Sequence, residues 1–370
     1  MSLKYLCHLT APVTSKLSSD NHRGEGRWER NVVDALTTQG CEVHTTTAVW
    51  HSSLQTPKTY HDNVNQEWVN DSIQISYGVD KKIYTGYYPD GLDPKYRIVQ
   101  YFDGPTEKTK DSFFQYDRKN AKSIICTHSF KAWEYERRLE NVLGKENIEW
   151  VIGPTVPFVV DEADNFRKPI LFWSYRNFIS YVVDYPTEMK KLFDKLFSYM
   201  KEDPTLQLKI LIHFSHGELY RNEIYADPIG WFLNLPFGKQ FSTYKDRIEL
   251  VWHLDWFKIL EIQKETCLNI APAEPLGGPP FEAGMYGIPM IFQNEINVFQ
   301  DRNRNLCFPE VLQAPRGIND SFLTFLDQLR YDKDTYHKYG NACRNFIKQN
   351  ATYEAYVNKI KSISEKRGWS

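Results

Sequence analysis

The sequence predicts an α/β protein made of two Rossmann-like domains. The chain has 370 residues, about twice the length of a typical domain. Short apolar runs alternate with amphipathic stretches in two successive series, a pattern typical of parallel β-sheets joined by helices. A Pro-rich segment near residues 153–169 separates the two series. We therefore expect a first domain over residues 1–158 and a second over residues 159–350, followed by a C-terminal helical segment, residues 351–370.

The first series opens with a strand, a helix and a second strand. An apolar run over residues 3–9 predicts the first strand, and the stretch 18–28, rich in Ser, Asn and Gly, predicts a loop. A helix follows and ends at Gly40, after which the β-branched run 41–50 predicts the second strand. Such a βαβ unit implies a parallel sheet. The apolar face of the helix consists of Trp28, Val32, Val33, Ala35 and Leu36.

The remainder of the first domain has a weaker pattern. Residues 51–95 are polar and Tyr-rich with little periodicity, and we expect a variable insertion there. Beyond it, the sequence predicts strands at residues 96–102, 123–129 and 149–152, and helices at residues 111–120 and 130–144.

The second series begins after the Pro-rich segment. The last helix, residues 351–366, is either a simple terminal cap or a segment that crosses back to the first domain. Before it, the pattern predicts strands at residues 169–173, 207–214, 247–254, 267–273 and 288–294, and helices at residues 185–201, 256–265, from 280 onward, and from about 319.

Composition and charge exclude several classes of protein. With 41% apolar and 15% aromatic residues the composition is typical of a globular protein and disfavours disorder. No run approaches 18 apolar residues, so the sequence predicts no membrane-spanning helix, and peripheral membrane contact stays open. The net charge of −2 divides evenly between the two predicted domains, which gives no support for a large nucleic-acid footprint. Six scattered cysteines without metal spacing predict free thiols and a cytoplasmic location: Cys7, Cys41, Cys126, Cys267, Cys307 and Cys343.

The segment 271–292 carries the clearest functional signal. A predicted strand ends close to Glu274, a turn of Gly and Pro follows, and Glu282 falls in the first turns of the next helix. Ligands of open α/β sheets bind outside the carboxyl ends of strands, and free amides at a helix start suit a diphosphate. Capping of the helix is the alternative use of Glu282. The amides expected to face the diphosphate belong to the stretch Gly277, Gly278, Pro279, Pro280 and Phe281.

This segment resembles the E-x7-E signature of the family-4 retaining glycosyltransferases. Glu274 and Glu282 have the family spacing, and Gly277 stands three places after the first carboxylate. The resemblance implies the GT-B fold, in which two Rossmann-like domains face each other across a cleft. It also implies that Glu274 contacts the donor sugar and that Glu282 holds the ribose hydroxyls of a nucleoside diphosphate sugar, a UDP- or GDP-sugar, with no metal or separate cofactor.

Other residues fit the same resemblance, with departures near the arginine and at Asp103, where many family members have a histidine. Gly26 is similar to the family's N-terminal glycine loop, and Arg176 to the arginine that binds the donor diphosphate. The family's lysine shortly after that arginine is absent, so we expect Arg221 or Arg304, or backbone amides, to replace it. The glycine that precedes the arginine in the family is here Tyr175.

The acceptor is expected to be a hydroxyl group, most simply of a carbohydrate, bound by the first domain. Asp103 and His128 follow predicted strands and are candidate acceptor-side residues, although Asp103 also suits a turn and His128 a structural position. In the segment 213–218, two histidines and a glutamate have no recognised metal-ligand spacing, so we expect no metal.

Three other functions remain open at this stage. One is a different enzyme on the same fold, such as a sugar-nucleotide epimerase or a phosphorylase-like enzyme. Another is a non-catalytic nucleotide-sugar-binding protein, which the missing lysine favours. A third is a DNA-modifying glycosyltransferase that acts on hydroxymethylated bases, for which a local basic patch would be required: Lys81, Lys82, Arg97, Arg137 and Arg138.

Overall fold

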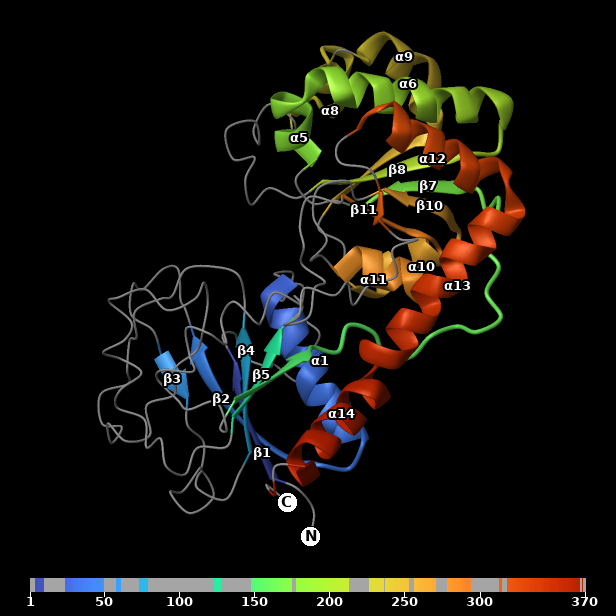
Figure 1. Ribbon diagram of the computed structural model, residues 1–370. Coiled ribbons are helices and arrows are strands. Elements are labelled where there is room, and N and C mark those ends of the chain that lie inside the picture. The colour runs from blue at the N-terminus through green and yellow to red at the C-terminus, as the bar shows by residue number, and fades with distance from the viewer. Residues whose placement is uncertain are drawn as a thin grey trace. The chain divides into compact units, whose positions relative to one another are not determined.

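The computed structural model divides the chain into two compact units, which are described separately (Figure 1). The first unit contains the described residues up to Phe158 and those from Lys348 onward, and the second contains those between Val159 and Ile347. The structure describes residues 4–9, 24–49, 58–60, 73–78, 123–127, 148–174, 178–212, 226–235, 237–252, 256–270, 278–293, 313–314, 318–366 and 368.

A six-stranded sheet forms the centre of the first unit, with the strand order β3-β2-β1-β4-β5-β6. All neighbouring strands are parallel except β3, which runs antiparallel to β2. The chain reverses its direction of winding between β1 and β4, as in the doubly wound dinucleotide-binding fold. The strands are β1 (Lys4–Leu9), β2 (Glu42–Val49), β3 (Lys58–Tyr60), β4 (Ile73–Gly78), β5 (Ser123–Thr127) and β6 (Ile148–Ile152).

Helix α1 (Gly24–Thr38) connects β1 to β2, and Gly40 ends it as predicted. Gly40 has φ of +73°, a left-handed conformation that favours glycine, and its amide donates to the Thr37 carbonyl at 3.0 Å. The Cys41 amide donates to the Leu36 carbonyl, which completes a Schellman motif. The predicted loop 18–28 is wrong from residue 24 onward, because α1 already begins there and includes Gly26 in its first turn.

The C-terminal helix α14 (Tyr353–Lys366) packs against α1 within the first unit, so it is a segment that returns to the first domain. The chain beside it is held by buried polar contacts. Asn31 of α1 donates to the Thr155 carbonyl at 3.1 Å and accepts from the Tyr353 hydroxyl at 2.9 Å. Val156 and Thr352 form a parallel bridge. The segment that leaves the first unit and the segment that re-enters it are therefore joined to each other and to α1.

The second unit repeats the same sheet order, here β12-β11-β10-β7-β8-β9, and all its strands are parallel. Strands β7 and β10 lie side by side where the winding reverses. Every residue of β10 is buried, as expected for a central strand covered on both faces. The strands are β7 (Ile170–Trp173), β8 (Gln207–Ile212), β9 (Ile248–Trp252), β10 (Thr266–Ile270), β11 (Met290–Gln293) and β12 (Gln313–Ala314).

Helices cover both faces of this second sheet (Figure 1). Leu171 and Trp173 of β7 belong to a large buried cluster with α6 and α12 on one face, whereas Ile170 and Phe172 pack with Ile259 of α10 on the other. This alternation follows from the two-residue period of a strand. The helices are α5 (Phe178–Asp184), α6 (Pro186–Glu202), α8 (Pro228–Leu233), α9 (Gly238–Tyr244), α10 (Trp256–Lys264), α11 (Gly278–Met285), α12 (Asp320–Tyr331) and α13 (Lys333–Asn350).

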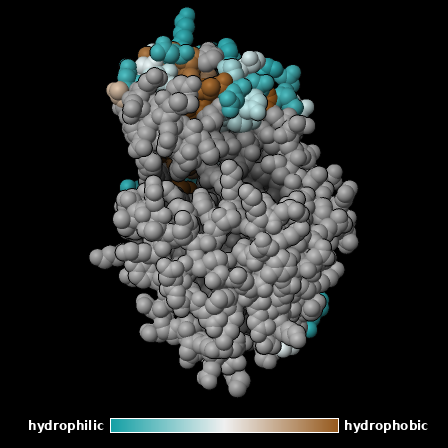
Figure 2. Space-filling view, turned by 90° about the vertical axis from the view of Figure 1, so that its left-hand side faces the viewer, coloured by the Kyte–Doolittle hydropathy of each residue, from teal (hydrophilic) through white to brown (hydrophobic). Residues whose placement is uncertain are grey.

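The surface of the second unit carries scattered apolar residues near α5 and α8. Val183, Tyr185 and Leu233 are exposed, and Figure 2 shows apolar side chains among polar ones on this side of the unit. Single exposed apolar residues are normal for a protein surface. No helix in the described part of the chain is both long and apolar enough to cross a membrane. Cys41, Cys267 and Cys343 are free thiols.

The secondary structure differs from the sequence-based expectation in a few places. Strand β4 lies inside the expected insertion 51–95, where six residues between polar neighbours gave too little periodicity to be recognised. The short helices α5, α8 and α9 were also missed. The predicted strand 96–102 and the predicted helices 111–120 and 130–144 lie outside the described residues.

The stability of the second unit should fall in acid through Asp203, which follows α6. The Thr205 hydroxyl and amide and the Arg330 guanidinium donate to its carboxylate at 2.6, 3.0 and 2.7 Å and lower its pKa, although partial burial acts in the opposite direction. Because the pKa is lower in the folded state, this stabilisation is complete above the unfolded pKa of about 3.9 and is lost as the pH falls through the folded pKa.

We expect Asp203→Asn to reduce the free energy of unfolding by about 2 kcal/mol at pH 7 and by much less near pH 3. Urea unfolding of both proteins across this pH range measures the difference. A difference that stays constant with pH would contradict the role given to the carboxylate.

Candidate functional site

The candidate site lies where the winding of the second sheet reverses, at the carboxyl ends of β7 and β10. Trp173 and Ile270 pair in register at this end, and the Ser174 amide donates to the Ile270 carbonyl at 3.1 Å. In doubly wound sheets the connections that leave two such strands diverge to opposite faces and leave room for a ligand. Strand β10 then leads to α11, which carries Glu282.

A buried polar pair joins the two strands at this edge. The Ser174 hydroxyl donates to the side-chain carbonyl of Asn269, and both residues are 2% exposed. Buried polar side chains are retained when they are hydrogen-bonded, and this bond fixes the two strand ends to each other. The sequence analysis missed this pair. The available signal was an asparagine inside an otherwise apolar strand, in the stretch Cys267–Ile270.

Glu282 is fully buried in α11. The indole Nε1–H of Trp256, the first residue of α10, donates to Glu282 Oε1 at 3.1 Å. The two helices pack against each other, so the carboxylate is held between elements that precede and follow β10. Burial raises the pKa of the Tyr286 hydroxyl, and the Glu282 carboxylate adds to this rise, which places the charge of Glu282 near Tyr286 as well. Because its hydrogen-bond partner Trp256 lies on the neighbouring helix α10, capping of α11 does not explain the position of Glu282.

The start of α11 provides fewer amide donors than its position suggests. The helix begins at Gly278, two residues earlier than predicted, and its next residues are Pro279 and Pro280. Proline has no amide hydrogen, so among residues 278–280 Gly278 alone carries an amide donor. The Phe281 side chain is fully buried and serves the core.

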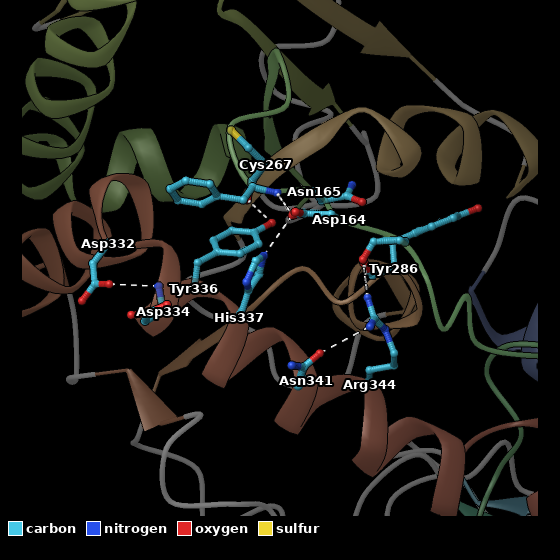
Figure 3. A network of polar contacts seen from close by, with 12 residues as sticks. Asp164, Asn165, Cys267, Tyr286, Asp332, Asp334, Tyr336, His337, Asn341 and Arg344 are labelled. Carbon is cyan, nitrogen blue, oxygen red and sulfur yellow. Dashed lines mark hydrogen bonds and ion pairs between the residues drawn. The ribbon is translucent and has the colours of Figure 1, made fainter.

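The end of α11 is fixed by two close backbone approaches. Gly287 follows the helix with φ of +70°, and a Cβ there would meet Arg344 Nη2 at 2.1 Å. Arg344 of α13 donates to the Tyr286 carbonyl at 3.0 Å (Figure 3) and to the Ala163 carbonyl at 2.6 Å. A Cβ on Gly340 would meet the Gly287 carbonyl oxygen at 2.0 Å. The turn after α11 therefore requires these two glycines and the arginine.

The opposite end of β10 is held by a second set of contacts (Figure 3). The buried Asn165 amide donates to the carbonyls of Gln263, Lys264 and Thr266 at 2.9, 3.1 and 2.8 Å. The Tyr336 hydroxyl donates to the Cys267 carbonyl at 2.8 Å, and burial raises the pKa of this hydroxyl well above its usual value. Strand β10 is thus held by side-chain hydrogen bonds at both of its ends.

Several predicted site residues lie outside the described residues, so their positions remain predictions. They are Glu274, Gly277, Arg176, Asp103 and His128, together with Arg221, Arg304, the segment 213–218 and the predicted basic patch. Gly26 is described, in the first turn of α1 rather than in a loop. Among the described residues, no group of His, Cys, Asp and Glu side chains is arranged to hold a metal ion.

Comparison with known proteins finds similarity at the level of structure. No protein-family model matches the sequence, and no curated protein matches it significantly. MnaA of S. aureus, solved with UDP, is 14% identical with a TM-score of 0.50, covering 100% of this chain and 98% of that one. Alr3699/HepE of Anabaena, solved with UDP and glucose, is 9% identical with a TM-score of 0.47, covering 98% and 99%.

The pneumococcal O-GlcNAc transferase GtfA, solved with UDP and GlcNAc, is 13% identical with a TM-score of 0.43. The match covers 81% of this chain, which spans about half the length of GtfA, 53% of it. At these identities the similarity concerns the fold. Two doubly wound sheets, each in its own unit, and a C-terminal helix that returns to the first unit give this chain the two-domain GT-B fold.

Proposed function

We propose that the protein is a glycosyltransferase that moves a sugar from a nucleoside diphosphate sugar to a hydroxyl acceptor, with retention of configuration and without a metal ion. The observation that carries this proposal is the fully buried Glu282 carboxylate in the helix that follows the switch-point strand. A carboxylate at the carboxyl-end edge of such a sheet is suited to a ligand that donates hydrogen bonds. A ribose diol is such a ligand, because both of its hydroxyls donate to a carboxylate.

In the proposed reaction, the bond between the anomeric carbon and the diphosphate oxygen breaks, and a bond from that carbon to the acceptor oxygen forms. The acceptor proton passes to the departing diphosphate, so atoms and charge balance. Glu282 holds the ribose, Glu274 orients the sugar, and Arg176 with the Gly278 and Phe281 amides stabilises the leaving group. The acceptor attacks from the face that the diphosphate leaves, with Asp103 and His128 on the acceptor side.

The substitution Glu282→Gln tests the donor site, because it removes the charge and keeps the size of the side chain. UDP and GDP, each at about 100 times its dissociation constant, should stabilise the wild type by about 2.7 kcal/mol and raise its melting temperature. We expect the variant to bind the same nucleotide ~100-fold more weakly, from the loss of charge-assisted hydrogen bonds. Calorimetric titration and thermal-shift measurements report both effects. Glu261→Gln, on the exposed side of α10, is the matched control and should behave as the wild type.

A turnover assay distinguishes glycosyl transfer from nucleotide-sugar binding and from epimerisation. Incubation with a UDP- or GDP-sugar and a panel of hydroxyl acceptors should give a glycoside whose anomeric configuration matches that of the donor. Nucleotide binding without any product would indicate a binding protein, and isomerisation of the donor sugar without an acceptor would indicate an epimerase. Either result, or unchanged nucleotide affinity in Glu282→Gln, would overturn the proposal.

A further inference from the structure

We propose that Trp256 is a positioning residue that holds the Glu282 carboxylate in the orientation needed to select ribonucleotides over 2′-deoxyribonucleotides. This inference rests on the proposed function, because it assigns a specificity to the same donor site. Trp256 acts by positioning Glu282 and takes no part in the chemical step.

The geometry defines how the two residues interact. The indole Nε1–H is the only hydrogen-bond donor of a tryptophan side chain, and it points at Glu282 Oε1 from 3.1 Å. Glu282 is fully buried, whereas Trp256 is half-buried at the first position of α10. The ring of the exposed Phe257 lies 5.4 Å from that of Trp256, centre to centre. The donor is therefore located on a different helix from the carboxylate, between the buried acid and an exposed aromatic residue.

The indole donor matters because a carboxylate can rotate about its last bond. Both oxygens of a carboxylate accept hydrogen bonds, and a diol is recognised well when the plane of the carboxylate is fixed before the ligand arrives. The indole donor fixes that plane through Oε1. In a buried site water does not readily replace a lost donor, so the effect of removing it is larger than at the surface. Loss of the indole donor should therefore weaken the recognition of the second ribose hydroxyl more than binding of the diphosphate.

The substitution Trp256→Phe removes the donor and retains an aromatic ring. The affinities of UDP, GDP and their 2′-deoxy analogues are measured by calorimetric titration on the full chain. We expect the preference of the wild type for the ribonucleotide to fall ~10-fold in Trp256→Phe, with little change in the affinity of the 2′-deoxy analogue. A purely structural role would instead weaken the binding of the ribonucleotide and of its 2′-deoxy analogue equally. Trp231→Phe on α8, where the tryptophan is also half-buried, is the matched control and should retain the full preference.

The combination with Glu282→Gln distinguishes the two proposals. If both single variants lose the ribose preference and the double variant loses no more than Glu282→Gln alone, Trp256 acts through Glu282 as inferred. If Glu282→Gln loses the preference and Trp256→Phe keeps it, the positioning role is wrong and the proposed donor site stands. If the wild type binds neither UDP nor GDP, or if Glu282→Gln leaves their affinities unchanged, the proposed donor site fails and this inference fails with it.

Discussion

Replacement of Gly340 by alanine is expected to destabilise the second unit by about 3 kcal/mol or more. At an ordinary helix position the same change stabilises by about 1 kcal/mol, because alanine has the higher helix propensity. Here the added Cβ would lie 2.0 Å from the Gly287 carbonyl oxygen. This oxygen is a backbone atom, and Gly287 is itself in a left-handed conformation with φ of +70°. Helix α13 must therefore move away from the turn after α11, and the contact of Arg344 with the Tyr286 carbonyl is lost with it.

Asn345→Ala is the control for Gly340→Ala, since Asn345 is exposed on the same helix and its replacement should stabilise the protein slightly. Thermal and urea unfolding of both variants measure the effects. If Gly340→Ala is as stable as the wild type, the close approach between α13 and the turn at Gly287 is not a feature of the folded protein. A folded variant should also bind UDP or GDP more weakly, because the same turn fixes the end of the helix that carries Glu282.

Asn165→Ala should cost about 3 kcal/mol of unfolding free energy. Its side-chain amide donates to three backbone carbonyls, those of Gln263, Lys264 and Thr266, at the junction between α10 and β10. Asn165 is 3% exposed, so water does not readily replace the lost donors. Asn341→Ala is the control, because Asn341 is exposed and makes a single 3.3 Å contact with Arg344; its effect should stay within about 0.5 kcal/mol.

Asn165→Asp provides a sharper test, since it keeps the size of the side chain and replaces the donor by an acceptor. A carboxylate facing three carbonyl oxygens is repelled, so the new carboxyl group should have a raised pKa in the folded state. Its protonated form is tolerated better, and the stability of this variant relative to the wild type should increase as the pH falls from 7 to 4. Chemical unfolding at these two pH values measures it. A pH-independent difference would mean that the amide of Asn165 does not donate to these carbonyls.

Both predictions concern the scaffold that places Glu282. Asn165 and Tyr336 fix the beginning of β10, and Gly287, Gly340 and Arg344 fix the end of α11. The contacts come from segments that are far apart in the sequence. A loss of nucleotide affinity in these variants would accordingly arise from displacement of α11, and it should be accompanied by a loss of stability, whereas Glu282→Gln should affect affinity first.

The alternating pattern of apolar runs was sufficient to predict most strands of the second unit. Strands β7 to β11 coincide with predicted runs, with β10 beginning one residue early at Thr266, because a buried parallel strand needs a nearly continuous apolar stretch that is visible in the sequence. The prediction that Gly40 ends α1 was correct for an equally local reason: glycine readily adopts the positive φ that a helix end requires, and Gly40 has it. Strand β4 escaped detection because it is short and its neighbours in the sheet, β1 and β5, supply the contacts that make it a strand.

The two successive βα series, the short spacing between Glu274 and Glu282, and the position of Glu282 near a helix start can be recognised in the sequence, because they depend on residues within a few places of one another. The burial of Glu282 against Trp256, the bond from Ser174 to Asn269 and the return of the last helix to the first unit become visible in the folded chain. Each of these contacts joins residues 26 or more positions apart, and which distant residues meet is set by the packing of strands and helices, which local periodicity does not encode.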